Sequence, residues 1–166
     1  MMKLTRLMLS LLLLVVLLFV AGCSSTVKST SKDPNMTAIK TVLEHQFTGP
    51  DSEFIEGTEN TEKLEEYYEK RYKSYFTEER YNSFIAASAY TYVLLAYNND
   101  KEIKAEKVDV RTEEGWYHFN VTVSYGEAGN GQNSAEVTGK AKINDDGKIT
   151  NVQYLNDGGL TSNLEN

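Results

Sequence analysis

The sequence predicts an α+β fold in which three N-terminal helices pack on a curved antiparallel sheet of about four strands. Apolar residues recur at helical spacing between residues 34 and 97, and they alternate with polar residues between 103 and 154. Short segments rich in Gly, Asn and Asp separate the alternating stretches, which is typical of hairpin turns. A run of helices followed by a run of strands favours α+β over an alternating α/β domain.

The chain opens with a segment typical of an export signal. Lys3 and Arg6 precede an apolar run over residues 7–20 that a single serine interrupts. The run is too short for a transmembrane helix, which needs about 20 apolar residues, and it has the length of a signal-peptide core. It ends in Val20-Ala21-Gly22-Cys23, which resembles the lipobox of bacterial lipoprotein signal peptides.

This resemblance implies that a diacylglyceryl group is attached to the Cys23 sulfur and that the chain is cut between Gly22 and Cys23. Cys23 is the single cysteine, so it has no internal disulfide partner. Two acyl chains hold a protein stably where one chain is marginal. We therefore expect a signal peptide at 1–22 and a lipid anchor on the extracytoplasmic face of the cell membrane. The alternative is an ordinary secretory signal or an uncleaved anchor.

Residues 23–33 are expected to form the lipidated cysteine and a flexible tether, because they are small and polar without apolar periodicity. A single globular domain is expected over residues 34–157. Asp33-Pro34 predicts the start of the first helix, since Asp is favoured at the N-cap and Pro at the first helical position. Gly49-Pro50 is expected to end that helix, and residues 51–60 to form an acidic loop.

The second helix is expected over residues 61–74, where a stripe of Leu and Tyr has helical spacing. Thr77 followed by two glutamates predicts the start of a third helix, because acidic side chains in the first turn complement the helix dipole. Residues 90–97 fit either an extension of this helix or a short buried strand. Helix is favoured near their start and irregular structure near Tyr97.

The strands are predicted over residues 103–112, 116–125, 134–143 and 149–154. The second alternates fully, with Phe119 and Val121 on one face and Trp116 and His118 on the other. Residues 144–147 read as a tight hairpin turn. The apolar phase slips between residues 149 and 152, which predicts a bulge in the last strand. We expect residues 158–166 to be a disordered tail.

The element order, the segment FTEERYNSF over residues 76–84 and the closing DGKITNVQY over residues 146–154 resemble the nuclear transport factor-like superfamily. This resemblance implies a cone-shaped domain over residues 34–157, of a kind that recurs in Gram-positive lipoproteins. A cystatin-like arrangement, with one long helix on a four-stranded sheet, is the nearest alternative. The three predicted helices favour the first.

The charge of the chain excludes some partners. It has 24 acidic and 17 basic residues, for a formal net charge of −7. Lys3 and Arg6 lie in the expected signal peptide, so the mature chain is more acidic still. This balance disfavours nucleic acid, which binds clustered Lys and Arg, and it disfavours electrostatic attraction to anionic lipid. Membrane attachment is therefore expected through the lipid anchor alone.

The sequence contains no recognisable catalytic set. Enzymes of the superfamily that the chain resembles place Asp, His or Tyr in the cone mouth. His45 and His118 are the two histidines, the residue type whose ordinary pKa lies nearest neutral pH. Neither has a Ser, Cys or Asp at triad spacing, and both fit structural roles. Glu53, Glu56 and Glu59 read as a solvated loop. We expect no enzyme, no catalytic residue, no metal site and no cofactor.

The recognition surface is expected at Trp116 and His118 on the outward strand face, together with Tyr97. Eight tyrosines crowd the helical half, and those outside the core are expected to line a ligand cavity or a protein-binding surface. The leading expectation is a non-enzymatic module that binds an envelope protein or a small ligand. The alternatives are a small hydrolase or isomerase with its site in the cone mouth, and an accessory or exclusion lipoprotein of a mobile element.

Overall fold

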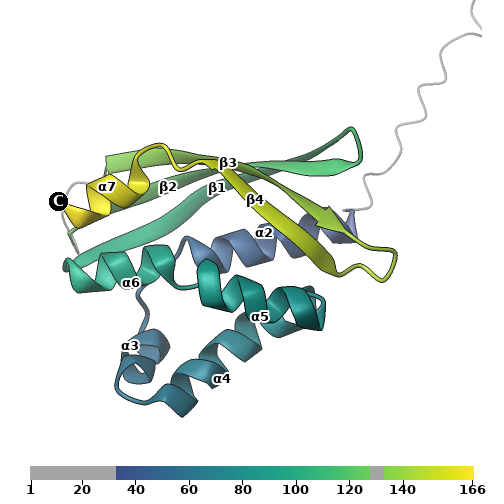
Figure 1. The fold of residues 1–166 in the computed structure, drawn as a ribbon. Coiled ribbons are helices and arrows are strands. Elements are labelled where there is room, and N and C mark those ends of the chain that lie inside the picture. The colour runs from purple at the N-terminus through teal and green to yellow at the C-terminus, as the bar shows by residue number, and fades with distance from the viewer. Residues whose placement is uncertain (1–32, 128–132) are drawn as a thin grey trace, which may run out of the picture. The chain divides into compact units, whose positions relative to one another are not determined.

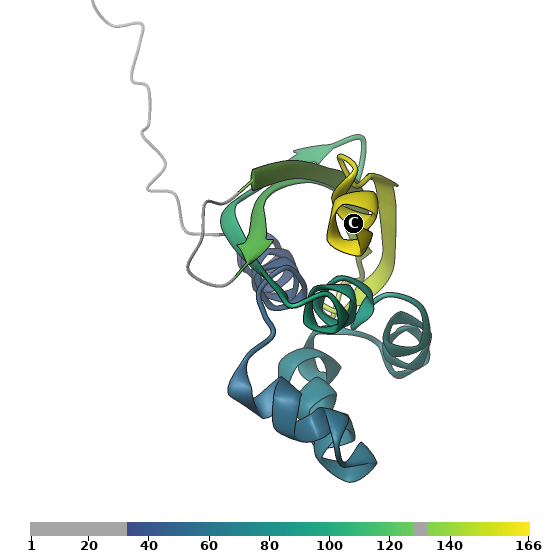
Figure 2. The same cartoon turned by 90° about the vertical axis from the view of Figure 1, so that its left-hand side faces the viewer.

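The computed structural model describes residues 33–127 and 133–166. The expected signal peptide, Gly22, Cys23 and all of the tether except Asp33 lie outside these residues. The described chain is α+β, as the sequence predicts: helices pack against one four-stranded antiparallel open sheet. Figure 2 shows the sheet arching over α2, α6 and α7, with α3 and α4 on the far side of α2 and α6.

The helical half has more helices than the sequence predicts. Within the described residues, five α-helices and one short 3-10 helix precede the sheet, and a further helix follows it (Figure 1). Their bounds are α2 Pro34–Gln46, α3 Ser52–Thr58, α4 Thr61–Tyr72, η1 Lys73–Tyr75, α5 Glu78–Ala87, α6 Thr91–Asn98 and α7 Leu160–Glu165. The prediction of three helices was therefore wrong.

Residues 51–60 contain α3 rather than the expected loop. The Asp51 carboxylate accepts a hydrogen bond of 2.8 Å from the Phe54 amide and so caps the helix. Phe54 is fully buried and anchors this short, acidic helix to the core. A Cβ atom on Gly57 would come within 3.2 Å of the Leu64 backbone, so glycine lets α3 lie close to α4.

The stretch after Thr77 forms two helices instead of one. The chain leaves helical geometry at Ser88, whose φ is −143°, and α6 begins three residues later. Residues 91–98 are helical to the end, which settles the earlier choice between helix and strand and corrects the irregular structure expected near Tyr97. Tyr92, Val93 and Ala96 are its buried residues, and it contacts the first strand.

The strands match the predicted pattern closely. They are β1 Lys101–Glu113, β2 Trp116–Glu127, β3 Asn133–Ile143 and β4 Ile149–Asn156, in the spatial order β1-β2-β3-β4. Ile143 pairs with Ile149 while Lys142 pairs with Asn151, so one residue of β4 is bulged where the sequence predicted a phase slip. The hairpin turn at Asn144–Gly147 is also confirmed, with Gly147 at φ 74°.

The C-terminal residues form α7 rather than the expected disordered tail. Leu160 and Leu164, four residues apart, have no exposed surface, and the helix contacts α6 and β3. The Asp157 carboxylate accepts hydrogen bonds from the Gly159 and Thr161 amides at the start of this helix. Lys101 Nζ donates to the carbonyls of Asn163 and Leu164 at its end. Burial and capping at both ends hold the segment in place.

The region described here has no helix of the length and apolarity needed to cross a membrane.

Candidate functional site

A groove of about 460 Å³ lies between α4 and α5 and reaches the residue that precedes α6. Its volume falls within the range of about 300–1,000 Å³ that is typical of small-ligand sites. Six apolar or aromatic residues line it: Leu64, Tyr68, Tyr81, Ile85, Ala86 and Tyr90. Four polar residues complete the lining: Thr61, Glu65, Glu69 and Asn82.

Helical periodicity builds the groove from both sides. Leu64 and Tyr68 are four residues apart on α4, and Tyr81 and Ile85 are four apart on α5, so each pair stands on one face of its helix. The start of α5 is tied to the sheet, because the Thr77 amide donates to the Ile149 carbonyl at 3.3 Å. This hydrogen bond holds the start of α5 against the sheet rather than against α4. The lining residues lie between the two helices.

Aromatic rings pack against one another beside the groove. The Tyr68 ring stands edge-on to Tyr67 at 5.2 Å between centroids and lies 6.0 Å from Tyr90. Tyr72 packs edge-on against Phe84 at 5.2 Å. Such contacts stabilise each ring by about 0.5–1.5 kcal/mol beyond its burial. Tyr68 and Tyr90 of the groove wall are therefore packed against other rings.

The Tyr68 hydroxyl is the unusual atom of the site. Tyr68 is only 5% exposed, and its hydroxyl is buried without a hydrogen-bond partner among residues 33–127 and 133–166. Burial raises the pKa of Tyr68 well above its ordinary value, so the hydroxyl keeps its proton. An unsatisfied buried polar group costs about 1–3 kcal/mol. By contrast, the neighbouring Tyr90 hydroxyl donates to the Ala86 carbonyl at 3.2 Å.

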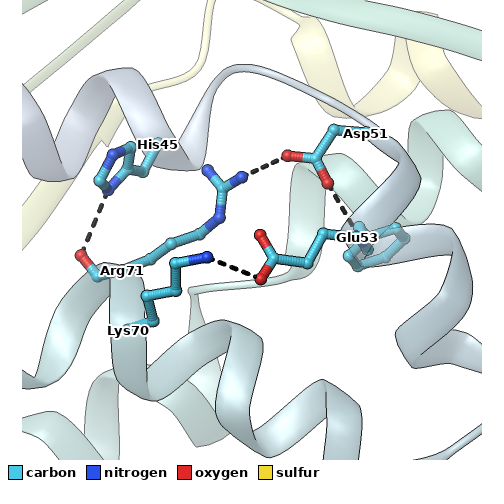
Figure 3. A network of polar contacts seen from close by, with 6 residues as sticks. His45, Asp51, Glu53, Lys70 and Arg71 are labelled. Carbon is cyan, nitrogen blue, oxygen red and sulfur yellow. Dashed lines mark hydrogen bonds and ion pairs between the residues drawn. The ribbon is translucent and has the colours of Figure 1, made fainter.

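A polar network next to the groove joins α2, α3 and α4 (Figure 3). The Arg71 guanidinium pairs with the Asp51 carboxylate and lies 4.3 Å from the centre of the Tyr67 ring. Lys70 pairs with Glu53 at 2.9 Å. These contacts fasten the start of α3 to the end of α4, so we interpret the network as structural.

His45 belongs to this network. Its Nδ1 lies 3.2 Å from the Arg71 carbonyl oxygen, which can only accept, so Nδ1 is the donor. Burial lowers the pKa of His45, and the Arg71 charge acts in the same direction. The neutral ring is therefore favoured in the folded protein. The contacts of His45 fit the structural role that the sequence indicated.

Of the residues expected to form the recognition surface, Trp116 and His118 share one face of the sheet and Tyr97 lies apart from them. Trp116 is half-buried on the outer face of the sheet, with Lys140 Nζ and Lys142 Nζ at 4.4 and 4.6 Å from its ring centre. His118 lies on the same face and lines a shallow pocket of about 330 Å³. Tyr97 lies beyond the opposite end of β1, at a distance on the order of 40 Å along the strand.

The concave side of the sheet is filled by aromatic side chains. Phe47 packs against Tyr92 at 4.9 Å between ring centroids, and Phe119 packs against Tyr154 at 5.8 Å. The Tyr154 hydroxyl donates to Gln46, and Gln46 Nε2 donates to the Ser88 carbonyl at 2.9 Å. The polar groups of this interior are thus bonded to one another.

Sequence reasoning named tyrosines as cavity residues but did not say which. The structure places Tyr68, Tyr81 and Tyr90 in the groove, whereas Tyr97 packs edge-on against Phe54 at 5.9 Å. Leu64 and Ile85 also belong to the apolar lining of the groove. The spacing of four in both helices was visible, but the direction of each stripe depends on how the helices cross.

The chain matches no family model, and no match was found among curated proteins or solved structures. Its class therefore follows from its own structure: an α+β domain with an open antiparallel sheet and an aromatic groove between two of its helices.

Proposed function

We propose that this protein is a lipid-anchored extracytoplasmic lipoprotein that binds a ligand, without transforming it, in the groove between α4 and α5. The observation that carries the binding role is the Tyr68 hydroxyl, which is buried without a partner in the described residues and belongs to a groove lining residue. Buried polar groups are normally hydrogen-bonded, and those that are not call for an explanation. A bound ligand supplies one.

The anchor rests on the sequence. Val20-Ala21-Gly22-Cys23 follows an apolar run that is too short to span a membrane comfortably. Lipidation at Cys23 explains a lone cysteine and gives two acyl chains, enough for stable anchoring. We further propose that the domain is nuclear transport factor-like, because several helices precede a sheet that arches over them (Figure 2).

Binding is favoured over catalysis by the packing of the sheet interior. In the superfamily that the chain resembles, enzymes use polar residues in the cone mouth. Here Phe47, Phe119 and Tyr92 pack around Tyr154 and Gln46 on that side of the sheet. The groove between α4 and α5 instead presents apolar and aromatic surface with a few polar groups, which is typical of ligand sites.

The binding role is tested with a fragment set of mixed charge and the full chain in uncharged detergent, by saturation-transfer NMR. Ala86 and Ala87 are neighbouring exposed residues of α5, and only Ala86 lines the groove. Ala86→Gln adds bulk to the groove without removing a side-chain contact, and Ala87→Gln is the matched control. We expect groove fragments to bind at least fivefold more weakly to Ala86→Gln and normally to Ala87→Gln. If no fragment separates the two variants, the groove is not the binding site.

A further inference from the structure

The α4 side of the groove carries negative charge that the protein does not fully neutralise. Glu65 and Glu69 both line the groove, one helical turn apart. Glu69 accepts an ion pair from Lys73 at 2.5 Å. Glu65 belongs to none of the ion pairs found within the described ranges. Like charges at this spacing repel, so a cation beside Glu65 and Glu69 is favoured.

The aromatic lining of the groove also favours a positively charged ligand. Tyr68, Tyr81 and Tyr90 all line it, and the face of an aromatic ring attracts cations within about 6 Å of its centre. Burial raises the pKa of the Tyr81 hydroxyl, and the nearby Glu69 and Glu65 raise it further while Lys73 lowers it. Rings and carboxylates thus favour the same kind of ligand.

The Tyr68 hydroxyl is a separate observation that points to a ligand. It belongs to a side chain that is more than nine-tenths buried, and it has neither a protein donor nor a protein acceptor in the part of the chain that the structure describes. A hydroxyl can donate to a ligand oxygen and accept from a ligand N–H. Tyr68 lines the groove, so a buried hydroxyl without a protein partner belongs to a residue of the groove wall.

We propose that the ligand of the groove is an organic cation with an apolar body, such as a substituted ammonium compound. This inference rests on the proposed function. Leu64, Ile85 and Ala86 provide surface for the apolar body, and Glu65, Glu69 and the tyrosine rings bind the charged head. A compact ammonium is strongly hydrated, whereas alkyl substitution spreads the charge over a surface that rings contact well. A substituted ammonium head therefore fits better than a bare one.

Choline and its uncharged carbon isostere, 3,3-dimethyl-1-butanol, test this inference because they differ in charge and hardly in shape. The experiment titrates each into the full chain in uncharged detergent and follows the methyl signals of Leu64 and Ile85 by NMR. Glu65→Gln removes a groove carboxylate. Glu66→Gln is the matched control, since Glu66 is an exposed neighbour on the same helix that does not line the groove.

We expect choline to bind at least fivefold more tightly than the isostere, and Glu65→Gln to weaken choline at least threefold without changing the isostere. Glu66→Gln is expected to change neither. The inference is overturned if the isostere matches choline, which would indicate a neutral apolar ligand, or if Glu66→Gln weakens choline as much as Glu65→Gln. In both cases fragment binding that depends on Ala86 would still support the proposed function. Absence of all groove binding would overturn both.

Discussion

Two aromatic regions of this molecule differ in whether their buried hydroxyl groups have hydrogen-bond partners. On the concave side of the sheet, Tyr154 donates to Gln46, and Gln46 donates to Ser88. In the groove between α4 and α5, the Tyr68 hydroxyl is equally shielded from solvent and is unpaired within the described residues. Both regions are built from packed rings, so aromatic content does not distinguish them.

The difference is in hydrogen bonding, and under our proposal it separates a structural region from a binding region. A satisfied buried network specifies packing and stabilises the fold. An unsatisfied group is a stability cost, and such costs concentrate at sites that interact with something else. Substitutions in the two regions should therefore change stability by different amounts and in different directions.

The largest effect is expected from Gln46→Ala. Gln46 has no exposed surface and bonds both Tyr154 and Ser88. Its loss leaves the Tyr154 hydroxyl without its acceptor, removes one of the two hydrogen bonds to the Ser88 carbonyl, and leaves a cavity. We expect the free energy of unfolding in urea to fall by about 3 kcal/mol. Gln153→Ala, at an exposed position of β4, is the control and should change it by no more than about 0.5 kcal/mol. Equal losses of unfolding free energy in the two variants would show that the interior hydrogen-bond network does not stabilise the fold.

The same contrast shows what the sequence could reveal. The sheet was predictable because alternation, turn residues and the phase slip in β4 are local signals. The helical half was less predictable from the sequence. Phe54 and Ile55 are the only large apolar residues of an acidic stretch, and Leu160 and Leu164 are the only large apolar residues of the tail. The burial of Phe54 and of the two leucines depends on tertiary contacts and on the caps at Asp51 and Asp157, which periodicity does not capture.

The sequence predicted that tyrosines would line the candidate site, but it did not predict where the site lies. The composition indicated that tyrosines outside the core would line a cavity. Three tyrosines line the groove, but two of them, Tyr68 and Tyr81, also belong to the buried core. Whether a buried hydroxyl finds a partner depends on distances between helices, which no sequence pattern reports. Tyr97 and Trp116 were grouped as surface aromatics, yet the length of β1 separates them.

Tyr154→Phe should give the second largest effect. It removes the donor to Gln46 and leaves the Gln46 side-chain oxygen buried without that bond. We expect a loss of about 1–2 kcal/mol in the free energy of unfolding, measured in urea at pH 7. An unchanged free energy of unfolding would mean that the hydrogen bond from Tyr154 to Gln46 does not stabilise the fold. The contrast between a stabilising interior and a binding groove would then fail for the interior.

A smaller effect is expected from pH. The pKa of His45 is lowered in the folded protein, chiefly by burial, so protons bind the unfolded chain more readily. The stability that the neutral ring contributes is complete above the unfolded pKa and is lost as pH falls from about 6.5 through the folded value. Glu44 and Asp51 act against Arg71 and moderate the shift.

His45→Asn should reduce this pH dependence, because the amide can still donate to the Arg71 carbonyl but does not titrate. The measurement is the urea unfolding free energy of both proteins between pH 5 and 8. His118→Asn is the matched control on the outer face of the sheet. A slope that His118→Asn removes and His45→Asn retains would reassign the titration.

Tyr68→Phe tests the central claim most directly, because it deletes only the hydroxyl that has no partner in the described residues. Removing an unsatisfied buried hydroxyl should leave the unfolding free energy of the ligand-free protein unchanged or raise it by up to about 1 kcal/mol. The same substitution at Tyr154 lowers it. A loss of 1 kcal/mol or more at Tyr68 would show that this hydroxyl is already bonded in the free protein, and the groove would lose the observation that marks it as a binding site.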